Sequence, residues 1–337
     1  VLFRSDLLDL ALLLNLLKIR VPSTRQKRVG NGTVKRIHIK MKKTLLVIAG
    51  PTAVGKTALC VEMAKSFHTE IISADSRQFY QELSIGTAKP SRDEQGGVKH
   101  HFIDSHSIHD YFSPGDFERE ALKVLTDLFQ THDIVILTGG SGLYLKALMD
   151  GLDDMPDVDL NLRENLMRAL ETDGLEKLFK QLQVLDPEYA LKVDSQNPQR
   201  VVRALEVCLS TGKSYTSFRN QQKADRPFEM IKICLDRPRE ELYARIDLRM
   251  DMMLAAGLVQ EAKDFEDFQD RYALKTLGYK EVYGFFRGEY DEAEMVRLLK
   301  RNSRHYAKKQ LTWFRHQDDF EFVHPDKAFN YIQGKLK

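Results

Sequence analysis

The sequence predicts an α/β fold in which a parallel sheet is flanked by helices. Short apolar segments at residues 44–49, 70–74, 101–104, 133–138 and 230–235 alternate with segments of helical periodicity. Strands that alternate with helices form parallel sheets, because each crossover between parallel strands needs a connection of helix length. A glycine-rich loop after the first strand and an all-helical stretch in the middle of the chain complete this prediction.

The first predicted strand leads directly into GPTAVGKT at residues 50–57, and the helical segment ALCVEMAKSF follows. This is the strand–loop–helix context of a phosphate-binding loop. Its glycines let consecutive backbone N–H groups surround phosphate oxygens, Lys56 adds a positive charge, and Thr57 offers a hydroxyl to a phosphate or to Mg²⁺. The expected fold is therefore P-loop NTPase-like, with an incidental glycine turn as the alternative.

The strand at 133–138 lacks a feature that ATP hydrolysis requires. An ATPase holds Mg²⁺ and its water with an acidic residue at the end of a second strand. Here IVILT ends in Thr138, Gly139 and Gly140. This ending argues against a motor or an ATPase and favours a loop that binds a departing diphosphate, while a small-molecule or nucleotide kinase remains an alternative.

Asp75 follows the second predicted strand, within ADSRQFY. Ligands of open α/β sheets bind at the carboxyl ends of the strands, so this carboxylate is placed to act as a general base or a Mg²⁺ ligand. Its neighbours Ser76, Arg77 and Gln78 are placed to read a substrate. The alternative is that Asp75 only caps a following helix. The turn TGGSGLY at 138–144 opens toward the same edge.

Histidine and cysteine spacing gives little support for a metal site. Four histidines lie close together, at His100, His101, His106 and His109. Adjacent strand residues point to opposite faces and the spacing fits no standard ligand set, so polar contacts are expected here. The three cysteines are far apart, which indicates a reducing cytosol rather than disulfides or a zinc finger.

Charge is distributed unevenly along the 337 residues. Residues 1–40 hold nine basic and two acidic residues, which leaves 42 basic and 47 acidic residues in the rest. Against this acidic background, residues 297–315 contain seven basic residues, no acidic residue and several aromatic ones. One helical face presents Arg297, Arg301, Arg304 and Lys308. The segment predicts contact with an RNA backbone and unstacked bases, with a solvated, ion-paired face as the alternative.

Four regions are expected along the chain. Residues 1–40 form an N-terminal extension, expected to be disordered or non-native, with a targeting segment as the alternative. Residues 41–152 form the first part of the P-loop core. Residues 153–212 form a helical insertion domain, because they show helical periodicity and no strand candidate. Residues 213–337 form the second part of the core with the basic C-terminal helix.

In their order, these motifs resemble those of the tRNA dimethylallyltransferases of the bacterial type, also called tRNA isopentenyltransferases. The resemblance extends from Met41 to about Arg315 and rests on GPTAVGKT, DSRQFY, IGTAKP, HHFID, GDF, GGSGLY, NPQRVVRALE, LGYKE and YAKKQLTWFR. It implies transfer of a dimethylallyl group from dimethylallyl diphosphate to N6 of the adenosine 3′ of the anticodon in tRNA, with release of pyrophosphate.

The resemblance also implies roles for individual residues. The catalytic residues would be Asp75 as the base, Thr57, and Arg245, with Arg249 one turn on as the competing arginine. The diphosphate would be held by Gly50, Pro51, Thr52, Ala53, Val54, Gly55, Lys56, Thr57 and Arg249, with Thr57 also a ligand of Mg²⁺. The tRNA would contact Asp75, Ser76, Arg77, Gln78, Ser141, Arg163, Gln199, Arg200, Val201, Val202 and Arg203. The basic C-terminal helix adds Arg304 and Lys308.

Further expectations are a Mg²⁺ cofactor, a monomer, a cytoplasmic location and no membrane association. Two alternative functions remain open. An adenylate isopentenyltransferase acts on free nucleotides, and it would not require the helical insertion or the basic C-terminal helix. A non-catalytic RNA-binding module would not depend on Asp75.

Overall fold

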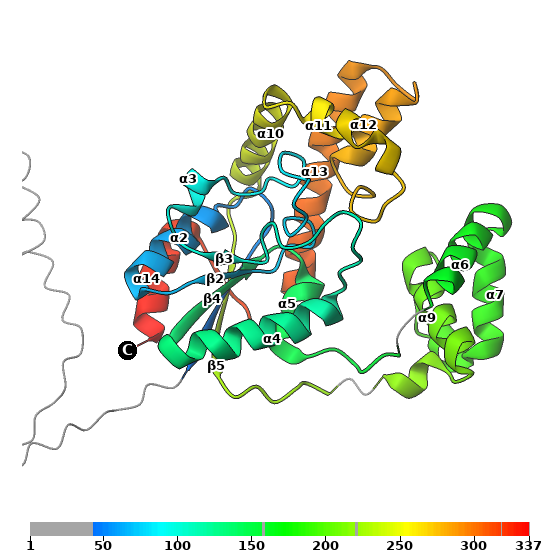
Figure 1. The fold of residues 1–337 in the computed structure, drawn as a ribbon, viewed down its shortest axis with the longest axis horizontal. Helices are drawn as coiled ribbons and strands as arrows, with labels where there is room; N and C mark the ends of the chain where they lie inside the picture. The colour runs from blue at the N-terminus through cyan, green and yellow to red at the C-terminus, as the bar shows by residue number, and fades with distance from the viewer. Residues whose placement is uncertain (1–42, 157–158, 220–221, 318, 337) are drawn as a thin grey trace, which may run out of the picture. The chain divides into compact units, whose positions relative to one another are not determined.

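The computed structural model describes residues 43–156, 159–219, 222–317 and 319–336. The expectations for residues 1–40 lie outside these ranges. At the centre of the described chain is a six-stranded sheet with the order β3-β2-β4-β1-β5-β6 (Figure 1). Every pair of neighbouring strands is parallel, which confirms the predicted fold class. The strands are β1 (Thr44–Ala49), β2 (Ile71–Ser73), β3 (His100–His101), β4 (Ile134–Gly139), β5 (Glu229–Leu235) and β6 (Glu321–Val323).

Two strands differ from the prediction. β3 has two residues and begins one residue before the predicted segment 101–104. Phe102 and Asp104 have positive φ angles of 62° and 53°, which end the extended chain there. β6 pairs with β5 at the edge of the sheet, and its three residues contain no apolar run that would predict it.

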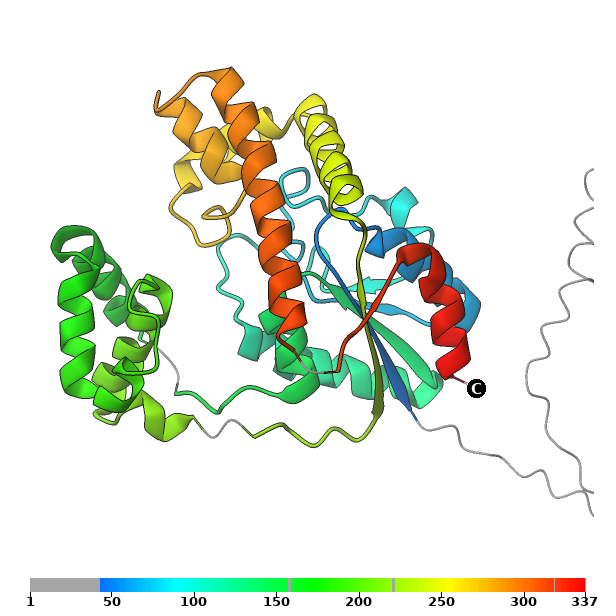
Figure 2. The same cartoon turned by 180° about the vertical axis from the view of Figure 1, so that it is seen from behind.

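The sheet separates two hydrophobic clusters, because β1 is apolar throughout and buried on both faces. Leu45 and Val47 belong to one cluster with residues of α4 and α5, whereas Leu46 and Ile48 belong to the other with residues of α2 and α14. Figures 1 and 2 show these helices on the two faces. The helices of this part are α2 (Lys56–Phe67), α3 (Arg92–Gln95), α4 (Pro114–Thr131), α5 (Gly142–Asp150), α10 (Arg239–Ala255), α11 (Leu258–Asp264), α12 (Tyr279–Phe286), α13 (Glu292–Arg315) and α14 (Pro325–Lys335).

The stretch expected to be helical contains only helices among its described elements. They are α6 (Leu160–Asp173), α7 (Leu175–Leu185), α8 (Pro187–Ala190) and α9 (Pro198–Thr211). Outside this stretch, the described residues include two short 3₁₀ helices, η1 (Tyr215–Phe218) and η2 (Glu266–Phe268). These helices have a hydrophobic cluster of their own, with Leu166, Leu182 and Leu205 at its centre. These helices therefore pack on one another around a core of their own.

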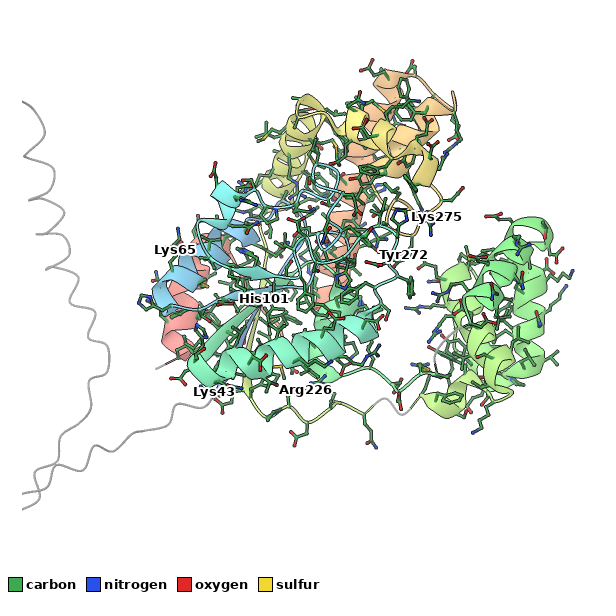
Figure 3. The ribbon with its side chains drawn as sticks, viewed as in Figure 1. Lys43, Lys65, His101, Arg226, Tyr272 and Lys275 are labelled. Carbon is green, nitrogen blue, oxygen red and sulfur yellow. The ribbon has the colours of Figure 1, made fainter. Side chains whose placement is uncertain are left out.

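The two connections to these helices meet at one point of the sheet-containing part. The Ala224 N–H donates to the Asp150 carbonyl at 2.6 Å, which joins the outgoing and returning chains. The Glu118 carboxylate on α4 accepts from the Leu152 N–H at 3.2 Å and from Arg226 Nη2 at 2.7 Å. Arg226 is labelled in Figure 3. One partly buried ion pair therefore holds both connections.

A candidate phosphate and acceptor site at the carboxyl edge of the sheet

A cavity of about 970 Å³ lies where β1, β2 and β4 end. Its lining includes the loop from Thr52 to Ala58, the turn from Asp75 to Gln78, and Thr138 to Gly140. Arg245 and Arg249 of α10 add positive charge to the wall. The structure thus brings most of the sequence-predicted phosphate and acceptor residues into one cavity, as expected when parallel strands end at one edge.

The phosphate loop turns through residues with positive φ. Gly50 and Gly55 have φ of 152° and 109°, and Ala53 has φ of 62°. Lys56 Nζ donates to the Gly50 and Pro51 carbonyls at 2.8 Å each, so the free loop satisfies its own lysine. Burial, helped by repulsion from Arg249, lowers the pKa of Lys56 to about 8.

Three arginines hold three consecutive residues of this loop. Arg249 Nη2 donates to Thr52 Oγ1 at 2.6 Å, and Arg245 Nε donates to the Ala53 carbonyl at 2.9 Å. Arg237, just before α10, donates from Nε to the Val54 carbonyl at 2.9 Å. Burial lowers the pKa of Arg249. Arg237 was not among the predicted site residues, because its contact with Val54 joins segments far apart in sequence.

Asp75 holds a turn and also lines the cavity. Oδ1 accepts from the backbone N–H groups of Arg77 at 2.9 Å and Gln78 at 3.3 Å, so the carboxylate stabilises a turn rather than a following helix. No hydrogen bond from a described residue reaches Oδ2. The side chain also lines the cavity together with Lys56. One oxygen is therefore held in place, and Asp75 remains a candidate general base, as its position at the strand end predicts.

The second glycine-rich turn contacts the Asp75 turn through Ser141. Ser141 Oγ accepts from the Ser76 N–H at 3.0 Å and lies 3.1 Å from Ser76 Oγ. Thr138 at the end of β4 donates its hydroxyl to the Ile48 carbonyl at 2.9 Å. The β4 end therefore places a neutral hydroxyl where an ATPase has its acidic residue.

Gln310 links the two glycine-rich loops, although it was not among the predicted site residues. Its Oε1 accepts from the Thr52 N–H at 2.9 Å, and its Nε2 donates to the Gly140 carbonyl at 2.9 Å. The side chain is 8% exposed. Its signal was present in the sequence: Gln310 falls between Ala307 and Phe314 on the buried stripe of α13.

Glu261 holds a further wall of the cavity. Its carboxylate accepts from the N–H groups of Ser84, Ile85 and Gly86, at 2.9, 2.8 and 2.8 Å. The Tyr279 hydroxyl donates to the same carboxylate at 2.6 Å. The IGTAKP segment, which lines the cavity, is thereby fixed to α11 and α12. No local pattern of the sequence indicates this long-range contact.

Tyr306 of α13 also lines the cavity, beside Asp75 and Ser141. Loss of water around its hydroxyl raises the pKa of Tyr306 to about 12, and the Asp75 carboxylate adds to the shift. The hydroxyl therefore stays protonated near neutral pH and is a hydrogen-bond donor toward the acceptor end of the cavity. The sequence marked Tyr306 only as one of several aromatics in a basic helix.

Two of the four basic residues on the predicted face of α13, Arg297 and Arg304, are ion-paired, whereas Arg301 and Lys308 have no ion pair with any described residue. Arg304 contacts both oxygens of Asp247 on α10, at 2.5 and 2.7 Å, so the ion-paired alternative holds for this residue. Further pairs join Lys300 to Asp251, Arg297 to Glu294 and Arg315 to Asp236. Lys308 and Lys309 are exposed and have no ion pair with any described residue. They line a hollow with His305, Thr312, Trp313 and His316.

The residues predicted on the helical insertion divide into two groups. Arg163 forms a bidentate pair with the fully buried Glu206, at 2.5 and 3.0 Å, which Arg203 joins at 3.3 Å. The side chains of Val201 and Val202 pack inside the cluster of this part, so we no longer expect them to contact RNA. The exposed members of the set are Gln199 and Arg200.

The four histidines make other contacts. His101 Nε2 lies 2.6 Å from Glu70 Oε2, and His100 Nδ1 lies 2.9 Å from the Val98 carbonyl. Within the described ranges, no group of three or more His, Cys, Asp and Glu side chains is arranged to hold a metal ion. In the same ranges no helix is both long and apolar enough to cross a bilayer.

Comparison with known proteins identifies the family. A model described as IPP transferase matches residues 78–317. The tRNA dimethylallyltransferase of Cytophaga hutchinsonii is 52% identical over 300 residues, which cover 88% of this chain and 99% of the relative. The tRNA dimethylallyltransferase 1 of Bacteroides fragilis is 46% identical over 298 residues, covering 88% and 99%.

Solved structures agree with these relatives. The full-length tRNA isopentenylpyrophosphate transferase from Bacillus halodurans has a TM-score of 0.64 and 36% identity, over 88% of this chain and 97% of that one. A eukaryotic dimethylallyltransferase acting on tRNA has a TM-score of 0.68 and 26% identity, over 84% and 74%. The chain therefore belongs to the IPP transferase family.

Proposed function

We propose that this enzyme transfers a dimethylallyl group from dimethylallyl diphosphate to N6 of the adenosine 3′ of the anticodon in tRNA. The observation that carries the proposal is the pairing of two features in one cavity. A phosphate loop lacks the acidic partner that ATP hydrolysis needs, and the Asp75 carboxylate lines the same cavity. A diphosphate and a weakly acidic amine are the substrates that this pair suits.

The phosphate end stabilises the departing pyrophosphate. Lys56 exchanges its two loop carbonyls for phosphate oxygens, and N–H groups at the start of α2 add their dipoles. A nearby anion raises the pKa of Lys56 from about 8, so the bound state holds the charged lysine. Arg249 and Arg245 lie on the loop and add charge as the C–O bond breaks.

The residues present fit a Mg²⁺ ion that the diphosphate itself helps to hold. Thr57 lines the cavity, and its hydroxyl has no side-chain hydrogen bond in the described part of the chain. Mg²⁺ commonly takes only one or two protein oxygens and keeps several waters when phosphates are present. When bound, the ion supplies further neutralisation of the leaving group. Thr57 is the residue that would hold it.

The acceptor end activates the amine. The N6 lone pair is delocalised into the purine ring, so attack on C1 of the dimethylallyl group needs help. The N6–C1 bond forms, the C1–O bond breaks with its electron pair on pyrophosphate, and the N6 proton passes to Asp75. Backbone N–H groups of Arg77 and Gln78 orient this carboxylate. Tyr306 and Ser141 offer hydroxyls beside it.

The tRNA reaches this site through an extruded base, because an adenine in a stacked loop does not expose N6 to a cavity. The exposed residues Lys308, Lys309, Gln199 and Arg200 are the proposed contacts to the rest of the RNA. We also infer a monomer, and a cytoplasmic location that the three free, buried cysteines suit. Light scattering with and without tRNA tests the monomer.

A transfer assay tests the function. Labelled dimethylallyl diphosphate is incubated with tRNA, with AMP, or with ATP alone. We expect label in tRNA and release of pyrophosphate. Label only in AMP would establish an adenylate isopentenyltransferase. Cleavage of ATP to ADP, with the γ-phosphate released or transferred, would establish an ATPase or a kinase. Omission of Mg²⁺ should lower transfer, and Thr57→Val should reduce the Mg²⁺ dependence, whereas Thr57→Ser should keep it.

Asp75→Asn tests the base with its turn intact. The amide oxygen still accepts from the Arg77 N–H, but the side chain accepts no proton from N6. Turnover should fall about a hundredfold or more, with tRNA affinity kept. Unchanged turnover would remove Asp75 from catalysis.

Arg245 and Arg249 are compared as alanine variants. Arg245 donates to a loop carbonyl and Arg249 to the Thr52 hydroxyl; we expect loss of Arg245 to lower kcat and loss of Arg249 mainly to raise KM for the diphosphate. The reverse pattern would exchange their roles.

A further inference from the structure

Two exposed tyrosines contact each other beside the catalytic turn. Tyr111 lies between β3 and α4, and Tyr272 lies between η2 and α12, where Figure 3 labels it. Their ring centroids are 5.6 Å apart at an interplanar angle of 64°. The residues are 45% and 47% exposed. Such a half-exposed pair buries little area, so packing alone does not explain it.

Guanidinium groups flank both rings. The Arg77 guanidinium lies 4.4 Å from the Tyr272 centroid, and the Arg163 guanidinium lies 5.2 Å from the Tyr111 centroid. The result is a row in the order Arg77, Tyr272, Tyr111, Arg163. Four separate chain segments supply it, and neither tyrosine lies in a helix or a strand.

The row begins at the turn from Asp75 to Gln78, which carries the proposed base. The Arg77 N–H donates to Asp75 Oδ1 at 2.9 Å, and the Arg77 side chain extends to Tyr272. Arg77 Nη1 donates to the Ser76 carbonyl at 2.8 Å, whereas its buried Nε–H has no acceptor among the described residues. The guanidinium therefore retains an unused donor next to the half-exposed Tyr272 ring.

We propose that Tyr272 and Tyr111 form a stacking platform for an unpaired nucleobase next to the target adenosine. Single-stranded RNA is recognised by splayed bases that stack on aromatic rings and on arginine planes, and both are present in this row. Guanidinium groups also complement phosphates. This inference rests on the proposed tRNA substrate and adds a subsite for one neighbouring base. The subsite binds the π-face of that base rather than its hydrogen-bonding edge.

The test combines enzyme variants with abasic RNA. The substrate is an anticodon stem-loop, and a series of stem-loops lacks one loop base at a time, with the target adenosine always kept. Steady-state transfer and fluorescence anisotropy give KM and Kd for each pair. Tyr272→Ala should raise both constants for the intact stem-loop about tenfold and leave KM for dimethylallyl diphosphate unchanged. Tyr272→Trp and Tyr272→Phe should remain near wild type, because they keep the ring.

The stacked base is identified as the one whose removal and the Tyr272→Ala substitution have non-additive effects on KM and Kd. On the stem-loop that lacks that base, Tyr272→Ala should cause no further loss, because the partner is already absent. Tyr111→Ala should show the same dependence with a smaller effect.

Tyr331→Ala is the matched control. Tyr331 also lies under a cation, with Lys335 Nζ 5.3 Å from its centroid, but it belongs to α14. Its loss should not change tRNA binding. The proposal is overturned if the Tyr272→Leu variant keeps the wild-type KM and Kd. It is also overturned if Tyr272→Ala raises KM and Kd by the same factor on every abasic stem-loop. No transfer to any stem-loop by the wild type would instead refute the tRNA substrate, a separate result.

Discussion

Two glycine-rich loops meet at the same edge of the sheet, and they use glycine for different reasons. In the phosphate loop, Gly50 and Gly55 have φ of 152° and 109°, which L side chains rarely adopt. In the second turn the constraint is space. A Cβ on Gly139 would lie 2.1 Å from the Ala74 carbonyl oxygen, and one on Gly140 would lie 2.4 Å from Gln310 Nε2.

The difference separates binding from positioning. The first loop directs its own lysine, hydroxyl and N–H groups into the cavity. The second turn holds neighbouring elements close, since a Cβ on Gly142 would also meet the Trp313 ring at 2.4 Å. Changes in the first loop should therefore affect chemistry with the fold kept, whereas changes in the second should affect the fold first.

Lys56→Met should give the largest effect and tests the first half of this comparison. Loss of the charge that stabilises pyrophosphate should lower kcat/KM about a hundredfold or more. The midpoint of thermal unfolding should be unchanged or higher, because the variant removes a buried charge. A large drop in the midpoint would show that this loop, too, is mainly structural.

Gly139→Ala tests the second half. The added methyl meets backbone on β2's side, so neither flexible side chains nor rotamer changes can accommodate it. The free energy of unfolding should fall by about 3 kcal/mol, measured by urea denaturation. Gly334→Ala is the control, because a Cβ there meets nothing within 4 Å in α14 and should stabilise slightly. Equal stability of the two variants would refute the spacing argument.

Gln310→Glu tests the link between the loops. The carboxylate still accepts from the Thr52 N–H but offers no donor to the Gly140 carbonyl. An unpaired buried carbonyl is costly, so the loops should separate and KM for dimethylallyl diphosphate should rise about tenfold. Gln310→Ala should give a similar KM with a lower unfolding midpoint. An unaltered KM in both variants would exclude Gln310 from positioning the phosphate loop.

The pH dependence of KM should give the smallest effect. The free enzyme has a Lys56 pKa of about 8, and a bound diphosphate raises it, so the complex holds more protons than the free enzyme above pH 8. Affinity is then complete below pH 8 and falls as the pH rises. KM for the diphosphate should increase about threefold between pH 7.5 and 8.5. Lys56→Arg should show no such rise, since arginine does not titrate there.

The sequence predicted the sheet and the phosphate loop well because both depend on local patterns. The continuous apolar run of β1 and the spacing from Gly50 to Thr57 are each visible within a dozen residues. Gln310 and Glu261 were missed because their roles arise only when α13 and α11 pack against loops far away in sequence. The ion pair of Arg304 could not be predicted for the same reason, since its partner Asp247 lies on α10.

The hydrogen bond between Ala224 and Asp150 has a consequence for the architecture. Residues 74 positions apart are backbone neighbours at the base of the helical insertion. A chain that closed there with a short turn would keep every strand of the sheet and the whole lining of the cavity. The helical insertion therefore joins the rest of the chain at two neighbouring backbone positions. A variant without it would show how much of the prenyl-transfer activity the sheet-containing part has by itself.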